Sequence, residues 1–158
     1  MAHTPNWSDF LNRYPSHLIQ TSGEFVGLPQ GQMGNSEVGH MTIGAGRVID
    51  QDLPRINRAI ENGEFQQNPV LLNLIGQSIN NKSAIHLIGL LSEGGVHSHE
   101  SQIHAVIQLC KDKKVDDLRI HAILDGRDTP PKSAEQNLSK LEKLLEKAGI
   151  GQVSTVSG

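Results

Sequence analysis

Three strand-like segments separated by two helical patterns constrain the fold of this chain more than any other feature. The segments lie at 84–90, 118–124 and 152–156, and the intervals between them predict helices near 100–113 and 133–148. Strands that alternate with helices are typical of βαβ units, in which right-handed crossovers join parallel strands. We therefore predict an α/β fold with a mainly parallel sheet.

The chain before this regular part contains fewer predicted elements. A short helix is expected at 4–14, with Thr4 as its cap and Pro5 at its first position. A strand is expected at 17–21, and a helical turn or two runs to about residue 43. Apolar spacings of three and four residues then predict packing helices at two places, 52–61 and about 68–79.

The change in pattern near residue 50 indicates a domain boundary. We predict two domains, 1–50 and 51–158, because a single strand and much loop give way there to a regular α/β arrangement. No linker or internal repeat separates them.

A glycine-rich stretch at 27–40 places a serine hydroxyl at the start of a helix. Gly31 and Gly34 allow the backbone to turn and to approach a ligand closely, and either Asn35 or Ser36 can cap the helix that follows. Free N–H groups at a helix N-terminus attract anions. Two interpretations stay open, an ordinary capped helix and a phosphoryl acceptor at Ser36, which would need a base, a metal ion or a positive field to react.

Two polar loops follow the first two predicted strands of the sheet, and the carboxyl ends of parallel strands are where ligands bind in such folds. The loop at 92–99 holds two glycines together with His97 and His99. Imidazoles there can bind an oxyanion or transfer a proton. They can also ligate zinc, but two ligands do not complete a zinc site. Solvated loop histidines are the alternative.

The loop at 125–131 combines a guanidinium group with carboxylates on a turn stiffened by two prolines. Arg127 can bind a carboxylate or phosphate through two parallel hydrogen bonds, and Asp128 can act as a base toward a substrate hydroxyl. The alternative is a local ion pair on an exposed turn, which contributes about 0 to 1 kcal/mol.

Composition excludes several classes of protein. A formal net charge of −3 and 3% aromatic residues do not favour a nucleic-acid surface. No apolar run approaches the roughly 18 residues of a membrane-spanning helix, so no membrane partner is expected. The single cysteine, Cys110, excludes an intramolecular disulfide and predicts a buried reduced thiol, which suits a cytoplasmic protein.

Three motifs, taken together and in order, resemble the cofactor-independent (2,3-bisphosphoglycerate-independent) phosphoglycerate mutases. They are Gly-Gln-Met-Gly-Asn-Ser-Glu-Val-Gly-His at 31–40, Gly-Gly-Val-His-Ser-His at 94–99 and Asp-Gly-Arg-Asp-Thr-Pro-Pro at 125–131. The stretches at 44–47 and 51–57 also resemble that family, so the similarity covers nearly the whole chain.

The resemblance implies an isomerase of glycolysis and gluconeogenesis that interconverts 3-phosphoglycerate and 2-phosphoglycerate through a phosphoserine. It implies an alkaline-phosphatase-like domain with two Mn²⁺ ions, to which 1–50 would belong, and an α/β phosphotransferase domain, to which 51–158 would belong. By resemblance Ser36 is both the phosphoryl acceptor and a metal ligand. His97, Arg127 and Asp128 match substrate contacts, and Asp128 is also the candidate general base or acid.

The family pattern begins with an Asp-Gly metal motif and continues beyond Val-Ser-Gly, so we expect an N-terminal fragment of a longer enzyme. Most manganese ligands would then be absent, and we expect the fragment to be inactive alone. The complete enzyme is expected to be monomeric and to bind phosphoglycerates. The alternatives are a non-catalytic module that binds phosphorylated metabolites or a partner chain, and, less favoured, a phosphatase or sulfatase-like hydrolase, which would lack the two transferase loops.

Overall fold

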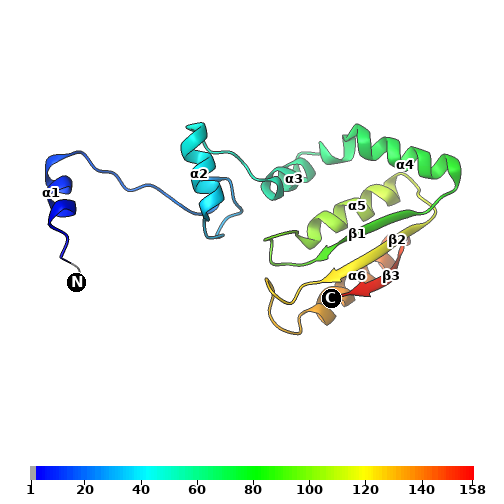
Figure 1. Cartoon of the computed structure of the whole chain (residues 1–158). Coiled ribbons are helices and arrows are strands. Elements are labelled where there is room, and N and C mark those ends of the chain that lie inside the picture. The colour runs from blue at the N-terminus through cyan, green and yellow to red at the C-terminus, as the bar shows by residue number, and fades with distance from the viewer. Residues whose placement is uncertain (1–2) are drawn as a thin grey trace. The chain divides into compact units, whose positions relative to one another are not determined.

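The computed structural model describes residues 3–158, and the chain divides into two compact units, Met1–Ile49 and Asp50–Gly158 (Figure 1). The functions assigned to the predicted domains 1–50 and 51–158 stay predictions.

The second unit is built on a sheet of three parallel strands. These are β1 (Ile85–Leu91), β2 (Leu118–Leu124) and β3 (Gln152–Ser157), in the order β1-β2-β3. Ile85 pairs with Leu118 and Leu91 with Leu124, so β1 and β2 end side by side. The predicted α/β class and parallel sheet are confirmed, with strand bounds within one residue of those expected.

Two crossover helices cover one face of this sheet. In Figure 1 the strands lie in front of α5 (Glu100–Asp112) and α6 (Ala134–Ala148), as the repeated strand and helix pattern predicts. Side chains that alternate along the strands meet apolar residues of the helices. The largest fully buried apolar side chains of this core are Leu91, Ile107, Cys110, Leu118, Ile120 and Leu141. Cys110 is a buried free thiol, as predicted.

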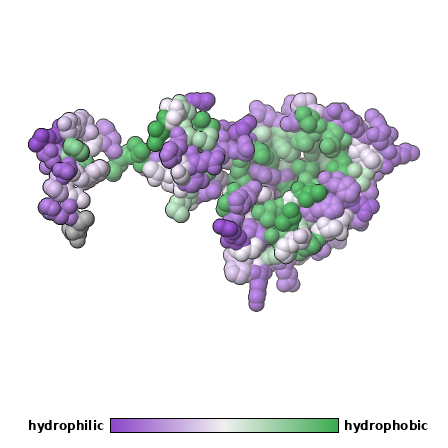
Figure 2. All heavy atoms as spheres, in the orientation of Figure 1, coloured by the Kyte–Doolittle hydropathy of each residue, from purple (hydrophilic) through white to green (hydrophobic). Residues whose placement is uncertain are grey.

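The opposite face of the sheet is open. Ile88 is 67% exposed and Ile123 is 41% exposed, and Figure 2 shows hydrophobic side chains gathered over the second unit in this view. His86 and His121 also lie on this face, where Nδ1 of His86 is 2.8 Å from Nε2 of His121. Parallel sheets are usually covered on both faces.

Two helices precede the sheet in the second unit, as predicted. They are α3 (Asp52–Glu61) and α4 (Pro69–Asn81), joined by the short helix η2 (Phe65–Gln67). Helix α4 begins at Pro69 because the side chain of Asn68 accepts hydrogen bonds from the N–H groups of the first turn.

The first unit contains α1 (Pro5–Arg13), the short helix η1 (Gly23–Val26) and α2 (Ser36–Ala45). Its small core consists of Val26, Leu28 and Val38. The strand predicted at 17–21 is wrong: Leu18 and Ile19 are exposed, and the described part of this unit offers no second strand with which to pair. Thr4 stands at the N-cap position of α1, as predicted, but its side chain makes no capping hydrogen bond.

Within the described part of the chain, no helix is both long and apolar enough to cross a membrane.

Candidate functional site

The loops after β1 and β2 are tied together by a buried hydrogen bond. The hydroxyl of Ser92 donates to Oδ2 of Asp125 at 2.5 Å and accepts the N–H of Gly94 at 3.0 Å. Ser92 and Asp125 are both buried. Because β1 and β2 are adjacent and end in register, residues 33 positions apart in sequence meet at one edge of the sheet.

Asp125 also shapes the turn that follows β2. Its Oδ1 accepts the backbone N–H groups of Arg127 and Asp128, each at 2.9 Å, and its carbonyl oxygen accepts the hydroxyl of Thr129. The hydrogen bond from Ser92, followed by those from the two N–H groups, lowers the pKa of Asp125. The residue is therefore ionised at neutral pH and fixes the positions of Arg127 and Asp128.

Sequence reasoning did not identify the roles of Ser92 and Asp125. The turn itself has a recognisable signal, since an aspartate that accepts N–H groups two and three residues later is a common turn element. The Ser92 contact has no local signal, because it depends on the register of two strands.

His97 and Asp128, which the sequence predicts as site residues, lie close together. Nε2 of His97 is 3.8 Å from Oδ2 of Asp128, with 72% of the His97 side chain exposed and 16% of that of Asp128. Arg127 is exposed in the same loop as Asp128. The two loops thus present an imidazole, a guanidinium group and a carboxylate at the end of the sheet.

The approach of the two loops depends on a glycine. A Cβ atom at Gly94 would lie 2.6 Å from the backbone oxygen of Asp128 and 3.1 Å from its Cβ. Any larger residue would therefore force the loops apart.

His99 has a structural role. Its Nδ1 accepts the backbone N–H of Ser101 at 3.2 Å, so it caps α5. Among residues 3–158, no group of three or more histidine, cysteine, aspartate or glutamate side chains is arranged to hold a metal ion. The zinc site considered for His97 and His99 therefore does not form in this part of the chain.

Ser36 belongs to the first unit, whereas the strand-end loops belong to the second. It is the first residue of α2, and Asn35 is the cap, since its Oδ1 accepts the N–H of Val38 at 3.1 Å. The exposed hydroxyl of Ser36 thus lies at a helix N-terminus, where the partial positive charge suits an anion. It also borders a mainly apolar cavity of about 580 Å³.

His40 lies one turn along α2 from Ser36. Its Nδ1 is 2.6 Å from the backbone carbonyl oxygen of Ser36 and 3.2 Å from the hydroxyl oxygen. Because a carbonyl oxygen only accepts hydrogen bonds, this Nδ1 carries the proton and cannot receive one from Ser36. The spacing of four residues on a helix predicts that Ser36 and His40 are neighbours, but it does not reveal which ring nitrogen carries the proton.

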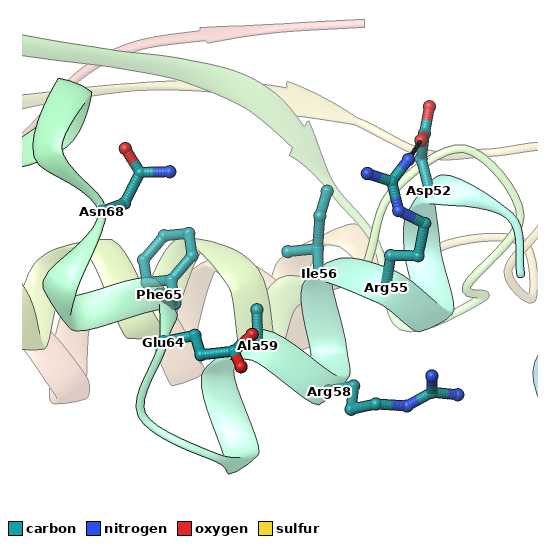
Figure 3. A pocket seen from close by; sticks show the side chains of 8 residues that line it. All are labelled: Asp52, Arg55, Ile56, Arg58, Ala59, Glu64, Phe65 and Asn68. Carbon is teal, nitrogen blue, oxygen red and sulfur yellow. Dashed lines mark hydrogen bonds and ion pairs between the residues drawn. The ribbon is translucent and has the colours of Figure 1, made fainter.

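A second groove, of about 510 Å³, lies beside α3 and η2 (Figure 3). Both guanidinium groups that line it are engaged, Arg55 with Asp52 at 3.0 Å and Arg58 with Asp50 at 2.7 Å. The groove therefore offers less to an anion than the strand-end loops.

Comparison with known proteins gives consistent findings. A family model described as the N-terminus of BPG-independent PGAM (iPGM_N) matches residues 56–158. Curated proteins named 2,3-bisphosphoglycerate-independent phosphoglycerate mutase are similar over almost the whole chain. The one from Hahella chejuensis is 50% identical over 99% of this chain and 30% of its own length. The one from Methylobacillus flagellatus is 51% identical over 100% of this chain and 31% of its own.

A solved structure is also similar. The chain superimposes on a crystal structure of Leishmania mexicana phosphoglycerate mutase at low cobalt concentration with a TM-score of 0.80 and 36% identity, covering 100% of this chain and 30% of that one. The chain therefore spans about 30% of the length of the proteins it matches.

Proposed function

Because this chain belongs to the family of BPG-independent phosphoglycerate mutases, we propose that it supplies the phosphoryl-accepting serine and a substrate-binding surface for the interconversion of 3-phosphoglycerate and 2-phosphoglycerate. This role covers only part of the catalytic machinery, because the chain spans about 30% of the length of its relatives. We expect the 158-residue chain alone to be inactive.

The observation that carries this proposal is the pair of tied loops at the strand ends. Arg127 would bind the phosphate or carboxylate of the substrate, and His97 would donate a hydrogen bond to the same anion. Asp128, 3.8 Å from His97, would move a proton at the glycerate hydroxyl. A ligand with two anionic ends and one hydroxyl would match these three groups.

Ser36 would take and return the phosphoryl group. A bond would form between Oγ of Ser36 and phosphorus while the bond from phosphorus to the glycerate oxygen breaks, and the serine proton would pass to the released hydroxyl through the acid and base groups. The neighbouring glycerate hydroxyl would then attack the phosphoserine and restore Ser36. His40 would not be the base, because its Nδ1 donates to the carbonyl oxygen of Ser36.

A divalent metal ion is part of the proposal, with Ser36 as one ligand and Mn²⁺ as the favoured ion. Such an ion would make the serine hydroxyl more acidic and neutralise phosphate charge. The described residues do not form a metal site on their own. The Leishmania mexicana structure at low cobalt concentration supports a divalent ion in general.

Two further features belong to the proposal. The single buried thiol, Cys110, suits a reducing cytoplasmic location. The complete enzyme would act as a monomer on small phosphoglycerates, without a nucleic acid or membrane partner.

A chimera tests the proposed function. We would replace the matching 30% of the Hahella chejuensis enzyme with this chain and assay mutase turnover. The chimera should be active and should carry phosphate on Ser36, and Ser36→Ala should abolish both. Ser154→Ala, at an exposed position on β3, is the matched control and should leave turnover unchanged. Full turnover by the Ser36→Ala chimera would contradict the proposal, and a folded but inactive chimera would favour the non-catalytic module.

A further inference from the structure

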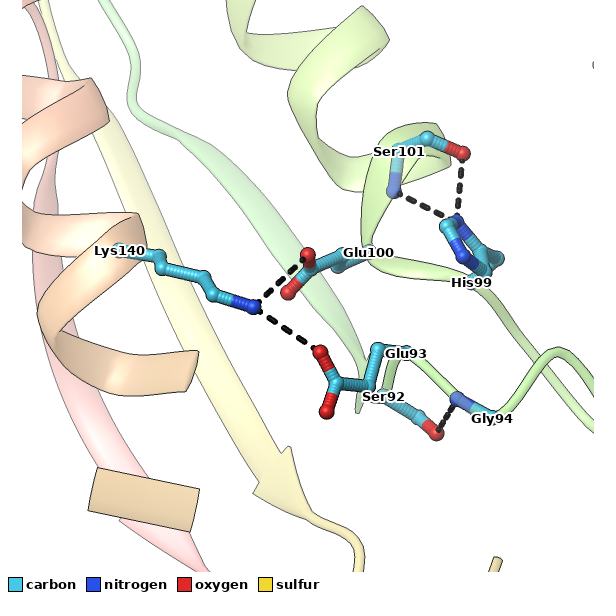
Figure 4. Close-up of polar contacts among 7 residues, drawn as sticks. All are labelled: Ser92, Glu93, Gly94, His99, Glu100, Ser101 and Lys140. Atoms are coloured by element: carbon cyan, nitrogen blue, oxygen red, sulfur yellow. Dashed lines mark hydrogen bonds and ion pairs between the residues drawn. The ribbon is translucent and has the colours of Figure 1, made fainter. Parts of the chain in front are cut away.

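One lysine of α6 joins the two ends of the loop that carries His97. Nζ of Lys140 lies 2.9 Å from Oε2 of Glu93 and 3.6 Å from Oε1 of Glu100 (Figure 4). Glu93 is the second residue after β1, and Glu100 is the first residue of α5. His97 lies between these two glutamates, so both ends of its loop are attached to a third element.

The other contacts of this loop hold its base. The N–H of Glu100 donates to the carbonyl oxygen of Ser92 at 2.7 Å, and the hydroxyl of Ser98 donates to the carbonyl oxygen of Leu90 at 2.7 Å. His97 itself is largely exposed, and Asp128 is 3.8 Å away. The position of the His97 ring therefore depends on how firmly the loop is held at its ends.

Lys140 also supplies the positive charge that Glu100 needs. The Glu100 side chain is 14% exposed, and its buried Oε2 has no hydrogen-bond partner in the described residues. His104 interacts electrostatically with this carboxylate, but burial lowers the pKa of His104 despite the opposing effect of Glu100, which leaves the imidazole neutral. The hydrogen bond to Glu93 and the charge of Glu100 raise the pKa of Lys140, which stays protonated.

We propose that Lys140 is a positioning residue: by bridging Glu93 and Glu100 it holds the His97 loop against the Asp128 loop, and so strengthens binding of the anionic substrate without touching it. The substrate part of this inference depends on the function proposed above. The loop part does not, because it concerns contacts within the chain.

The first experiment measures the order of the loop without ligand. In the 158-residue chain, Lys140→Met should raise amide hydrogen exchange at 93–99 by about five- to tenfold, as expected for a charge pair with one largely buried partner. Lys140→Arg should restore slow exchange. Lys143→Met removes the same charge from an exposed position one turn along α6 and should have no effect.

Glu93→Gln separates loop order from stability. It removes the charge from only the exposed partner of Lys140 and leaves Glu100 paired with its lysine, so thermal unfolding should not change while exchange at residues 93–97 rises. Unchanged exchange in both Glu93→Gln and Lys140→Met would overturn the proposal.

The second experiment titrates 3-phosphoglycerate into the labelled chain and follows the ring signals of His97 by NMR. Lys140→Met should weaken binding about fivefold, and Lys140→Arg should weaken it less than twofold. Equal weakening by Lys140→Met and Lys143→Met would show a general charge effect and overturn the positioning role. If the loop loosens as expected but even the unmodified chain does not bind, the positioning of the loop is supported and the proposed substrate is contradicted.

Discussion

Nδ1 of His40 donates to the backbone carbonyl oxygen of Ser36 at 2.6 Å, which places it 3.2 Å from the Ser36 hydroxyl oxygen. The imidazole therefore stands beside the proposed phosphoryl acceptor, with its Nδ1 proton directed at the carbonyl oxygen of the same residue. This arrangement can orient the hydroxyl, but it cannot accept the hydroxyl proton.

The protonation state of His40 can be measured directly. In the neutral ring we expect the proton on Nδ1, the less common tautomer in water, because the carbonyl oxygen of Ser36 requires a donor. ¹⁵N NMR of the imidazole should show a protonated Nδ1 and an unprotonated Nε2. The reverse assignment would contradict this geometry, and His17, an exposed histidine of the same unit, serves as the reference.

Gly94→Ala should separate the two strand-end loops. Its Cβ would lie 2.6 Å from the carbonyl oxygen of Asp128, so the loops must shift at a cost of about 1–3 kcal/mol in the free energy of unfolding. Gly126→Ala is the matched control in the neighbouring loop, where no atom lies within 4 Å of the added carbon, and should change stability by less than about 0.5 kcal/mol. Denaturant unfolding measures both, and equal effects would rule out this contact as the cause.

The Ser92 and Asp125 contact should give stability a specific pH dependence. The hydrogen bond from Ser92 and the two backbone N–H groups lower the pKa of Asp125 below its ordinary value of 3.8. Its stabilising effect is therefore fully present above pH 3.8 and is lost as pH falls through the lowered pKa.

Ser92→Ala tests that dependence. The variant should be less stable than the unmodified chain at pH 7, and the difference should shrink as Asp125 becomes protonated in acid. Ser154→Ala, at an exposed position, should show no such trend. A difference between Ser92→Ala and the unmodified chain that stays constant from pH 7 to pH 2 would contradict the assigned role of Asp125.

Cys110 should resist thiol reagents while the chain is folded. Burial raises its pKa to about 11, and the side chain is 1% exposed. At pH 8 only about one thiol in a thousand would be ionised, so labelling should follow unfolding. Rapid labelling of the native chain would show that the core around α5 opens. Complete labelling in denaturant is the control.

The sequence predicts the second unit well because its signals are local. Strand-like segments that alternate with polar loops and helical patterns specify β1, α5, β2, α6 and β3 almost to the residue. The strand expected at 17–21 is wrong for the complementary reason. A strand is stable only with a neighbour, and the local sequence does not state whether one is present.

Prediction of the candidate site from the sequence has the same limit, because contacts between distant segments carry no local signal. His97, Arg127 and Asp128 follow strand ends, so the topology predicts that they gather. The contact of Ser92 with Asp125 depends on strand register, and the proton position of His40 depends on a side-chain rotamer. Lys140 is one of several lysines on α6, and only the packing of α6 beside α5 distinguishes it from Lys143 and Lys147.

The open face of the sheet has a consequence for handling this chain in solution. Ile88 on the edge strand β1 and Ile123 on the central strand β2 present apolar surface, and the outer backbone groups of the edge strands β1 and β3 can pair with another molecule. Sulfate and other salts that favour apolar burial will promote self-association of the chain. Light scattering should then increase with protein concentration. Replacing Ile88, which lies outside the buried core, with a charged residue is the simplest way to prevent this self-association.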